Sequence, residues 1–380
     1  MKIDSHYYAL LAFARACGFK QESAYKLAYA SQFVDDAKIN YITVRDENTL
    51  ESIGVNVKYF EKSNSGKRVF HDMATCHSYE KIKTFTYESM TRNTCAFHFV
   101  PGGEGESFVH KMRCVEDSKI IQGILKEALE YNDVIRLGIV MHAYADTFSH
   151  QGFSGLLSRI NDIDDLKPKF KGASLTESMI LRVKHYSNRA KYKLMKYADR
   201  FVPAYGHAQA VDFPDLPYLT WRYTYDASDY SLEDWSEKEV DNTFRFRFAF
   251  EKISAHLRGY LEKNPEHKDE SFIYPVTEEL YKKLLSNERE GVRIKNWRSF
   301  MTANGMFPEN HPALTYDKYQ WLKNAFSDFS KRKFDQRKVE NVELAPDFEN
   351  KEWYSFYNSV HWYKERFFDY CEQYGVKISM

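Results

Sequence analysis

One stretch limits the possible folds of this chain more than any other, residues 137–153, with the sequence LGIVMHAYADTFSHQGF. His142, Asp146 and His150 follow one another there at steps of four residues. If the stretch is an α-helix, each step turns the chain by about 400° and advances it by about 6 Å, so the three side chains share one face. Imidazole and carboxylate groups at this spacing are typical ligands of zinc or iron. The stretch therefore predicts a helix with a metal-binding face.

Gly138 lies one helical step before His142 and leaves room there for another backbone or side chain. The alternative for such a face is a row of polar residues, each satisfied by a neighbour and without any metal. A third ligand in phase, inside an otherwise apolar segment, favours the metal interpretation because buried polar groups are costly unless they are paired or liganded.

The composition is that of a globular protein larger than one average domain. With 380 residues, of which 43% are hydrophobic, the chain can bury a substantial core, and 28 tyrosines and 28 phenylalanines predict that this core is aromatic. The formal net charge is zero, so no overall field favours the binding of a polyphosphate such as nucleic acid.

The sequence also bears on location. The first residues contain no basic region followed by an apolar run, and no window approaches roughly 18 uninterrupted apolar residues, so we expect neither a secretory signal nor a transmembrane helix. The five cysteines are an odd number without zinc-finger spacing, which favours reduced thiols. We predict a cytoplasmic protein, with export as a bacterial effector that lacks a signal peptide as the alternative.

Hydrophobic periodicity predicts a mainly α fold with little strand. The expected helices cover residues 5–17, 22–36, 118–131, 132–150, 178–197 and 241–263. Residues 40–70 are expected to be irregular or to form a hairpin around the turn at 64–67. An extended stretch that contains His98 is expected to lead into a loop at 101–103, and a second loop to cover residues 204–217.

The chain changes character near residue 265, which predicts two parts. Residues 1–265 are expected to form the metal-binding domain, and residues 266–380 an accessory helical region rich in tryptophan, lysine and glutamate. We expect this region to pack on the domain and to shape substrate access or bind a protein partner. Its candidate ligands His311 and His361 are expected to bind no metal.

Several polar positions outside the central stretch are further candidates for metal binding. Each alone has a structural explanation as a helix cap, a satisfied core histidine or a turn residue. Their joint presence with the central three residues favours the interpretation that they bind metal, since buried imidazoles and carboxylates need partners. These positions are His6, Asp35 with Asp36, His98, and His207 with Asp212 and Asp215.

The ordered set resembles the zinc-dependent phospholipase C family and the related fungal single-strand nucleases with three zinc ions. The resemblance covers residues 6–215, and the chain departs from the family at its first residue, where Met1 stands in place of tryptophan. The matching motifs are Ser5-His6, Ala30-Ser31 followed by Asp35-Asp36, His98-Phe99-Val100-Pro101, His142 with Asp146 and His150, and His207 with Asp212.

The resemblance implies a helical bundle with a metal cluster, and it implies roles for single residues. Asp35, His98 and His142 would hold one metal. Asp146 would bridge to a second metal that His6 also binds. His150, His207 and Asp212 would hold a third, and Asp35 and Asp146 would be the catalytic residues.

Together these observations predict a metal-dependent phosphodiesterase or phosphohydrolase that uses zinc-activated water. Its cofactor would be one to three Zn²⁺ ions, with manganese or iron as alternatives. Its substrate would be a phospholipid, a nucleic acid or a small phosphodiester. Two other classes stay open: a non-catalytic binding or scaffold protein on the same fold with structural or lost metals, and a helical iron-dependent enzyme.

Overall fold

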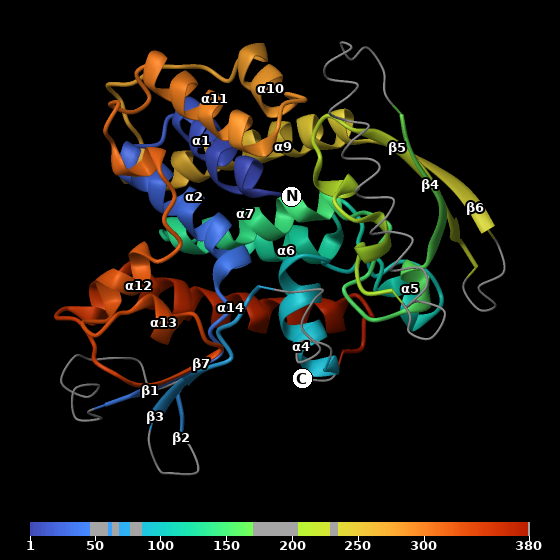
Figure 1. Ribbon diagram of the computed structural model, residues 1–380, viewed down its shortest axis with the longest axis horizontal. Helices are drawn as coiled ribbons and strands as arrows, with labels where there is room; N and C mark the ends of the chain where they lie inside the picture. The colour runs from blue at the N-terminus through green and yellow to red at the C-terminus, as the bar shows by residue number, and fades with distance from the viewer. Residues whose placement is uncertain (46–59, 63–67, 77–85, 170–203, 229–234, 379–380) are drawn as a thin grey trace.

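The computed structural model describes residues 1–45, 60–62, 68–76, 86–169, 204–228 and 235–378 (Figure 1). The strands are β1 (Tyr41–Val44), β2 (Phe60–Lys62), β3 (Arg68–His71), β4 (Ile163–Lys169), β5 (Thr220–Asp226), β6 (Trp235–Asp241) and β7 (Lys338–Val342). The α-helices are α1 (Leu10–Cys17), α2 (Gln21–Asp36), α4 (Tyr87–Ser89), α5 (Phe108–Lys111), α6 (Lys119–Ala128), α7 (Val134–Ser149), α9 (Asn242–Lys263), α10 (Glu278–Leu284), α11 (Glu290–Ala303), α12 (Gln320–Ala325), α13 (Lys331–Phe334) and α14 (Glu352–Gln373). The other helical turns are the π-helical η1 (Asp4–Ala9) and η4 (Met90–Cys95), and the 3₁₀ turns η5 (Arg159–Asn161), η6 (Ala208–Ala210), η7 (Phe213–Asp215), η8 (Pro265–His267), η9 (Pro312–Leu314) and η10 (Phe348–Asn350).

Two sheets accompany the helical majority in the described part of the chain. One has the strand order β2-β3-β1-β7 and the other has the order β4-β5-β6. The fold is therefore mixed α/β, and the prediction of a mainly α, phospholipase C/nuclease-like helical bundle is wrong. Strand β5 carried a signal that could have corrected it, because Trp221 and Tyr223 alternate with more exposed residues and point into the core.

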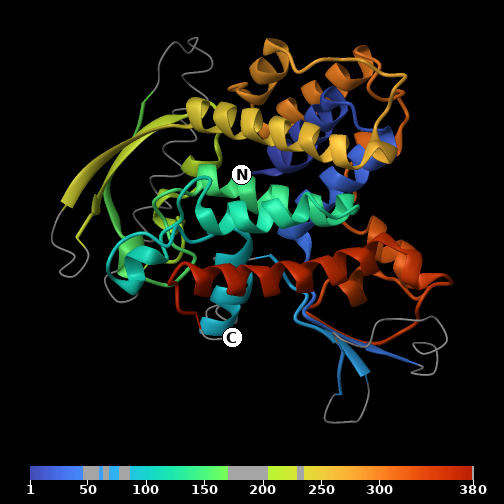
Figure 2. The same ribbon diagram turned by 180° about the vertical axis from the view of Figure 1, so that it is seen from behind.

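Helix α7 is the centre of the helical part. It contacts α2, α6, α9 and α14, and every residue from Leu137 to Ser149 is buried. The carboxylate of Asp133 caps its first turn by accepting hydrogen bonds from the backbone N–H groups of Ile135 and Arg136. In both ribbon views the gold α9, the green α7 and the red α14 lie one above another (Figures 1 and 2).

Most of the expected helices are confirmed. Helical structure covers residues 4–17, 21–36, 119–128, 134–149 and 242–263, and Gly18 ends the first of these segments with φ of 105°. The expected helix at 178–197 lies outside the described residues. The stretch before His98 is not extended as expected, because η4 and one further helical turn occupy it, and His98 follows in a turn.

The four-stranded sheet joins the two ends of the chain. Strands β2 and β3 pair antiparallel, with Phe60 opposite Phe70, so the hairpin within residues 40–70 is confirmed, although its turn at 63–67 lies outside the described residues. Strand β1 pairs antiparallel with β3 and parallel with β7, which brings Val339 beside Ile42.

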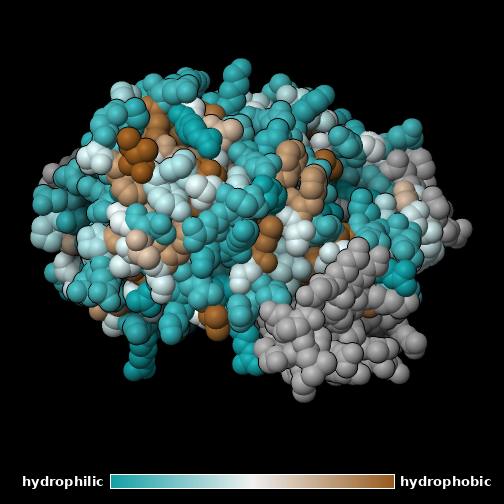
Figure 3. Space-filling model, turned by 90° about the horizontal axis from the view of Figure 1, so that it is seen from above, coloured by the Kyte–Doolittle hydropathy of each residue, from teal (hydrophilic) through white to brown (hydrophobic). Residues whose placement is uncertain are grey.

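The core continues from the N-terminal to the C-terminal part. One hydrophobic cluster runs from Met1 to Val376 and includes the buried Trp297, Trp321 and Trp353, while a smaller cluster around Trp221 underlies the second sheet. Residues 266–380 thus share a core with residues 1–265, and a division into two parts stays a prediction. The face seen from above is mainly hydrophilic, with hydrophobic side chains in small separate groups (Figure 3).

Among the described residues, no helix combines the length and the apolar character that crossing a bilayer requires.

Candidate metal centre

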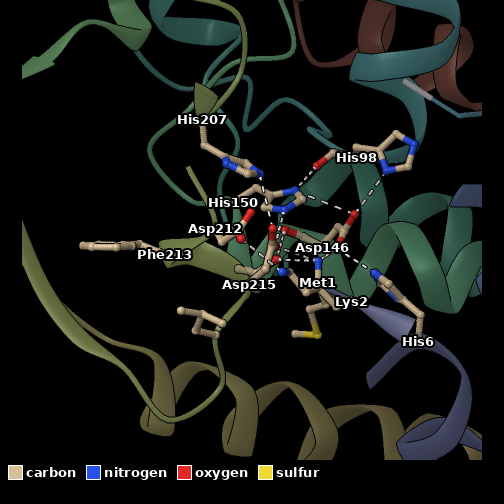
Figure 4. A network of polar contacts seen from close by, with 12 residues as sticks. Met1, Lys2, His6, His98, Asp146, His150, His207, Asp212, Phe213 and Asp215 are labelled. Atoms are coloured by element: carbon tan, nitrogen blue, oxygen red, sulfur yellow. Dashed lines mark hydrogen bonds and ion pairs between the residues drawn. The ribbon is translucent and has the colours of Figure 1, made fainter. Parts of the chain in front are cut away.

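Histidines and aspartates from distant parts of the chain converge at the C-terminal end of α7 (Figure 4). They form three groups in which the potential ligand atoms all lie within 4.8 Å of one another. No member of these groups comes from the described residues beyond 265. The groups are His6 with Asp35 and His142, His98 with His142 and Asp146, and His150 with His207 and Asp215.

The group around His98 and His142 has the spacing of a metal site. His98 Nδ1 lies 3.2 Å from His142 Nε2, and each of these nitrogens lies 3.3 Å from Asp146 Oδ2 and 3.8 Å from Asp35 Oδ1. Four donors at tetrahedral positions about 2.0–2.1 Å from a zinc ion lie about 3.3 Å apart. Neighbouring ligand atoms around one zinc ion would therefore have nearly these separations.

A second group lies beyond His150. His150 Nε2 is 3.1 Å from Asp215 Oδ1, and His207 Nε2 is 3.7 Å from Asp215 Oδ2. Asp212, the expected carboxylate, is not a member: its side chain is 50% exposed and lies 3.3 Å from Lys2 Nζ. The turn η7 accounts for this correction, because it turns Asp215 inwards while Asp212 stays at the surface.

Asp146 lies between the groups, and its two oxygens face different sides. Oδ1 is 3.0 Å from His6 Nε2, whereas Oδ2 faces His98 and His142. The rings of His6 and His142 stack with their centroids 3.9 Å apart. A carboxylate with this orientation can bridge two cations, which is the role that the resemblance implied for Asp146.

The α-amino group of Met1 also reaches the centre. It lies 2.5 Å from Asp146 Oδ1 and 3.1 Å from Asp215 Oδ1 (Figure 4). Burial alone would lower the pKa of this amine, but the charges of Asp146 and Asp215 raise it to about 11. The same ammonium, together with His150, holds the pKa of Asp146 well below its usual range against the opposing effect of burial.

Backbone carbonyls fix the orientation of three imidazoles. His98 Nε2 is 3.0 Å from Thr75 O, His150 Nδ1 is 2.7 Å from His98 O, and His207 Nδ1 is 2.8 Å from Val211 O. A carbonyl oxygen only accepts, so each of these nitrogens carries its ring's N–H. In the neutral ring the other nitrogen then presents a lone pair to the aspartates, as metal-binding histidines do.

Burial keeps the innermost histidines neutral. It lowers the pKa of His207 to about 4, and it lowers the pKa of His142 and, with help from the neighbouring His142, that of His6. At His207, where a carbonyl accepts the ring's N–H, the lone pair of the neutral ring therefore faces Asp215 Oδ2. Such acceptor–acceptor contacts are unfavourable unless a cation lies between them.

Asp35 is the accessible member of the centre. Its side chain is 30% exposed, whereas the side chains of His98, His142 and Asp146 are no more than 1% exposed. Burial and the charge of Asp146 raise the pKa of Asp35 to about 7, although His98 opposes them. At neutral pH this carboxylate can therefore both release and accept a proton.

A pocket adjoins the C-terminal end of α2, the end that carries Asp35. It has a volume of about 460 Å³ including the space open to solvent, and Asp36, the neighbour of Asp35, forms part of its wall. Aromatic side chains of α2 and α14, among them Phe33, Trp353 and Phe356, make up much of the lining.

Two contributors to the centre were missed in the sequence, the Met1 amine and the carbonyl of Thr75, and Asp212 was expected as the ligand in place of the other candidate, Asp215. Asp215 could have been found only as one of two aspartates in the loop after His207, because composition does not tell which of them turns inwards. Thr75 contributes a backbone atom, for which no side-chain pattern exists.

Fold and site together define a mixed α/β protein with a buried histidine–aspartate centre that could hold metal ions. Residues 1–371 match a family described as a family of unknown function (DUF6765), and the chain belongs to this family. Searches among curated proteins and among solved structures gave no significant match. Membership of this family does not indicate an activity, so we infer a function from the chemistry of the centre.

Proposed function

We propose that the chain is a metal-dependent phosphoric ester hydrolase with zinc as its preferred ion. One observation carries the proposal: imidazole nitrogens and carboxylate oxygens converge at 3.2–3.8 Å in a buried centre. These separations fit ligands of one zinc ion.

The donor set narrows the cofactor. It contains nitrogen and oxygen atoms and no thiolate, which suits zinc and also manganese or iron. The three groups allow one to three ions. His98, His142, Asp146 and Asp35 would hold the first, His6 and Asp146 would contribute to a second, and His150, His207 and Asp215 would hold a third. Bound ions supply Lewis acidity at a phosphoryl group and lower the pKa of water.

The roles of the residues follow from their accessibility and charge. Asp35 is the most accessible carboxylate of the centre, with a side chain that is 30% exposed, so we assign it the general base that takes a proton from the attacking water. Asp146 stays ionised, and its two oxygens face His6 on one side and His98 and His142 on the other. The closed interior around them excludes bulk water and strengthens their electrostatic effect.

The substrate class within the proposal is a phosphodiester: a phospholipid, a nucleic acid or a small diester. Support comes from the ordered motifs that resemble phospholipase C and the single-strand nucleases. Seven of their residues lie within the three groups: His6, Asp35, His98, His142, Asp146, His150 and His207. The aromatic pocket beside Asp36 offers a place for an apolar or ring-shaped part of such a substrate. Action in the cytoplasm, and a protein partner for residues 266–380, belong to the same proposal.

The test compares hydrolysis by zinc-loaded protein of bis(4-nitrophenyl) phosphate, phosphatidylcholine vesicles and single-stranded DNA. His142→Ala and Asp146→Asn should lose hydrolysis while circular dichroism still reports a helical fold. Asp212→Asn is the control with an unchanged rate, because Asp212 lies outside the groups. Metal-loaded wild type that cleaves none of the three substrates would contradict the proposal, and global unfolding on metal removal would indicate a structural metal instead.

A further inference from the structure

Lys364 on α14 is a cation enclosed in the protein. Its side chain is 2% exposed, and four oxygens lie within hydrogen-bond distance of its ammonium, which has three N–H groups to donate. Those acceptors are Asp72 O at 2.8 Å, Asp72 Oδ1 at 2.9 Å, Ala74 O at 3.2 Å and Asn93 Oδ1 at 3.1 Å. A buried ammonium with so many specific partners holds them at defined positions, because moving any one of them leaves a polar group unpaired.

These partners belong to the two chain segments that meet at His98. Ala74 precedes Thr75, whose carbonyl lies 3.0 Å from His98 Nε2. Asn93 belongs to η4, the helical turn that leads directly into His98, and the N–H of His98 donates to Thr94 O at 3.0 Å. Lys364 therefore bonds to the segment that carries the imidazole and to the segment that carries its acceptor.

The other side of the Thr75 segment is bound to the end of α2. Thr75 Oγ1 donates to Val34 O at 2.7 Å, and the N–H of Thr75 donates to Ala37 O at 2.9 Å. Asp35 lies between Val34 and Ala37 in the sequence. These two hydrogen bonds therefore also fix the Thr75 segment relative to the partly exposed carboxylate of the centre. Lys364 holds the same segment through Ala74 O, next to the Thr75 carbonyl that accepts from His98.

We propose that Lys364 is a positioning residue for the metal centre: it holds Thr75 O against His98 Nε2, so that His98 presents Nδ1 to the ion. This inference rests on the proposed function only in requiring a bound metal. Without the lysine, the carbonyl and the ring lose their common anchor, and His98 can rotate or present its other nitrogen. Partners that orient a ligating histidine typically contribute 10–100-fold to metal affinity.

The test is zinc affinity, measured by competition with a chromogenic chelator, in wild type and Lys364→Met. The variant should bind the zinc ion held by His98 at least about tenfold more weakly, in line with lost histidine orienters. The matched control is Arg15→Met, because Arg15 is also 2% exposed and hydrogen-bonds to Met306 O and Asp269 far from His98. It should lower stability but leave zinc affinity unchanged.

A nuclear magnetic resonance signal separates positioning from general damage. Zinc-loaded wild type should show a protected Nε2–H resonance of His98, which His98→Ala identifies and which Lys364→Met should lose while Arg15→Met keeps it. If Lys364→Met does not fold, Asn93→Ala decides, since it removes one of the four acceptors and should weaken zinc binding several-fold.

Unchanged zinc affinity in folded Lys364→Met, or in Asn93→Ala when the lysine variant does not fold, would overturn the inference. Wild type that binds no metal would instead contradict the proposed function, so the two failures are distinguishable.

Discussion

Gly138 packs so closely against α2 that a Cβ at this position would lie 2.3 Å from the carbonyl oxygen of Leu27. The expectation that Gly138 leaves room for another backbone is thereby confirmed. This contact lets α2 and α7 approach closely along their length, and it brings Asp35 from α2 to within 3.8 Å of His142 on α7. The geometry of the centre thus depends on a residue without a side chain.

Gly138→Ala should destabilise the protein and weaken zinc binding, because α2 has to move away from α7 and takes Asp35 with it. Overpacking of this kind costs about 1–3 kcal/mol. Urea unfolding and zinc competition measure the two effects. The control is Gly259→Ala on α9, where a Cβ would meet nothing within 4 Å. That helix should gain roughly 0.5–1 kcal/mol from the better helix former. Equal changes in stability and zinc affinity in the two variants would contradict the role of Gly138 in the close approach of α2 and α7.

Asp215→Asn should remove one metal-binding group, because His150 and His207 both face that carboxylate. Elemental analysis should then find less zinc per chain than in wild type. Asp212→Asn, three residues earlier, should leave the zinc content unchanged, since Asp212 pairs with Lys2 at the surface. The opposite outcome would restore Asp212 as the ligand.

Acid should destabilise the fold through His361, which lies outside the metal groups. Burial and the charge of Lys364 lower its pKa from 6.5 to about 4. Between these values the unfolded chain binds a proton that the folded chain does not, so stability falls as pH falls through this window, by about 2–3 kcal/mol for one such group. In urea unfolding at pH 7 and pH 4.5, His361→Gln should lose correspondingly less stability than wild type. Identical losses would contradict the buried neutral state.

Residues beyond 265 should contribute no ligand. His311→Ala and His361→Ala should therefore keep the zinc content of wild type, even where they lower stability. A loss of zinc in either variant, with the fold intact, would contradict this division.

Much of the centre could be predicted from local sequence patterns, because α7 sets the spacing of His142, Asp146 and His150 by helical periodicity alone. His6, Asp35, His98 and His207 could be proposed as further ligands, since chemistry and order identify such residues even when distances are unknown. The inward turn of Asp215 depends on η7, and no periodicity describes so short a turn.

The long-range strand pairing in the sheets could not be predicted from local sequence patterns. Strand β7 pairs with β1 across almost the whole chain, and such long-range pairing leaves no local pattern. The helical turn before His98 was missed for a related reason: Thr91 and Thr94 within it and Phe97 after it favour strands, and tertiary packing overrides that preference.

We expect the imidazoles and carboxylates around Asp146 to enclose metal ions. Elemental analysis of protein purified without chelators, with His98→Ala/His142→Ala as the paired variant, tests it most directly. The account predicts at least one transition-metal ion per chain, mainly zinc, in wild type and a lower content in the double variant. Metal-free wild type that takes up neither zinc nor manganese when these are added would contradict it.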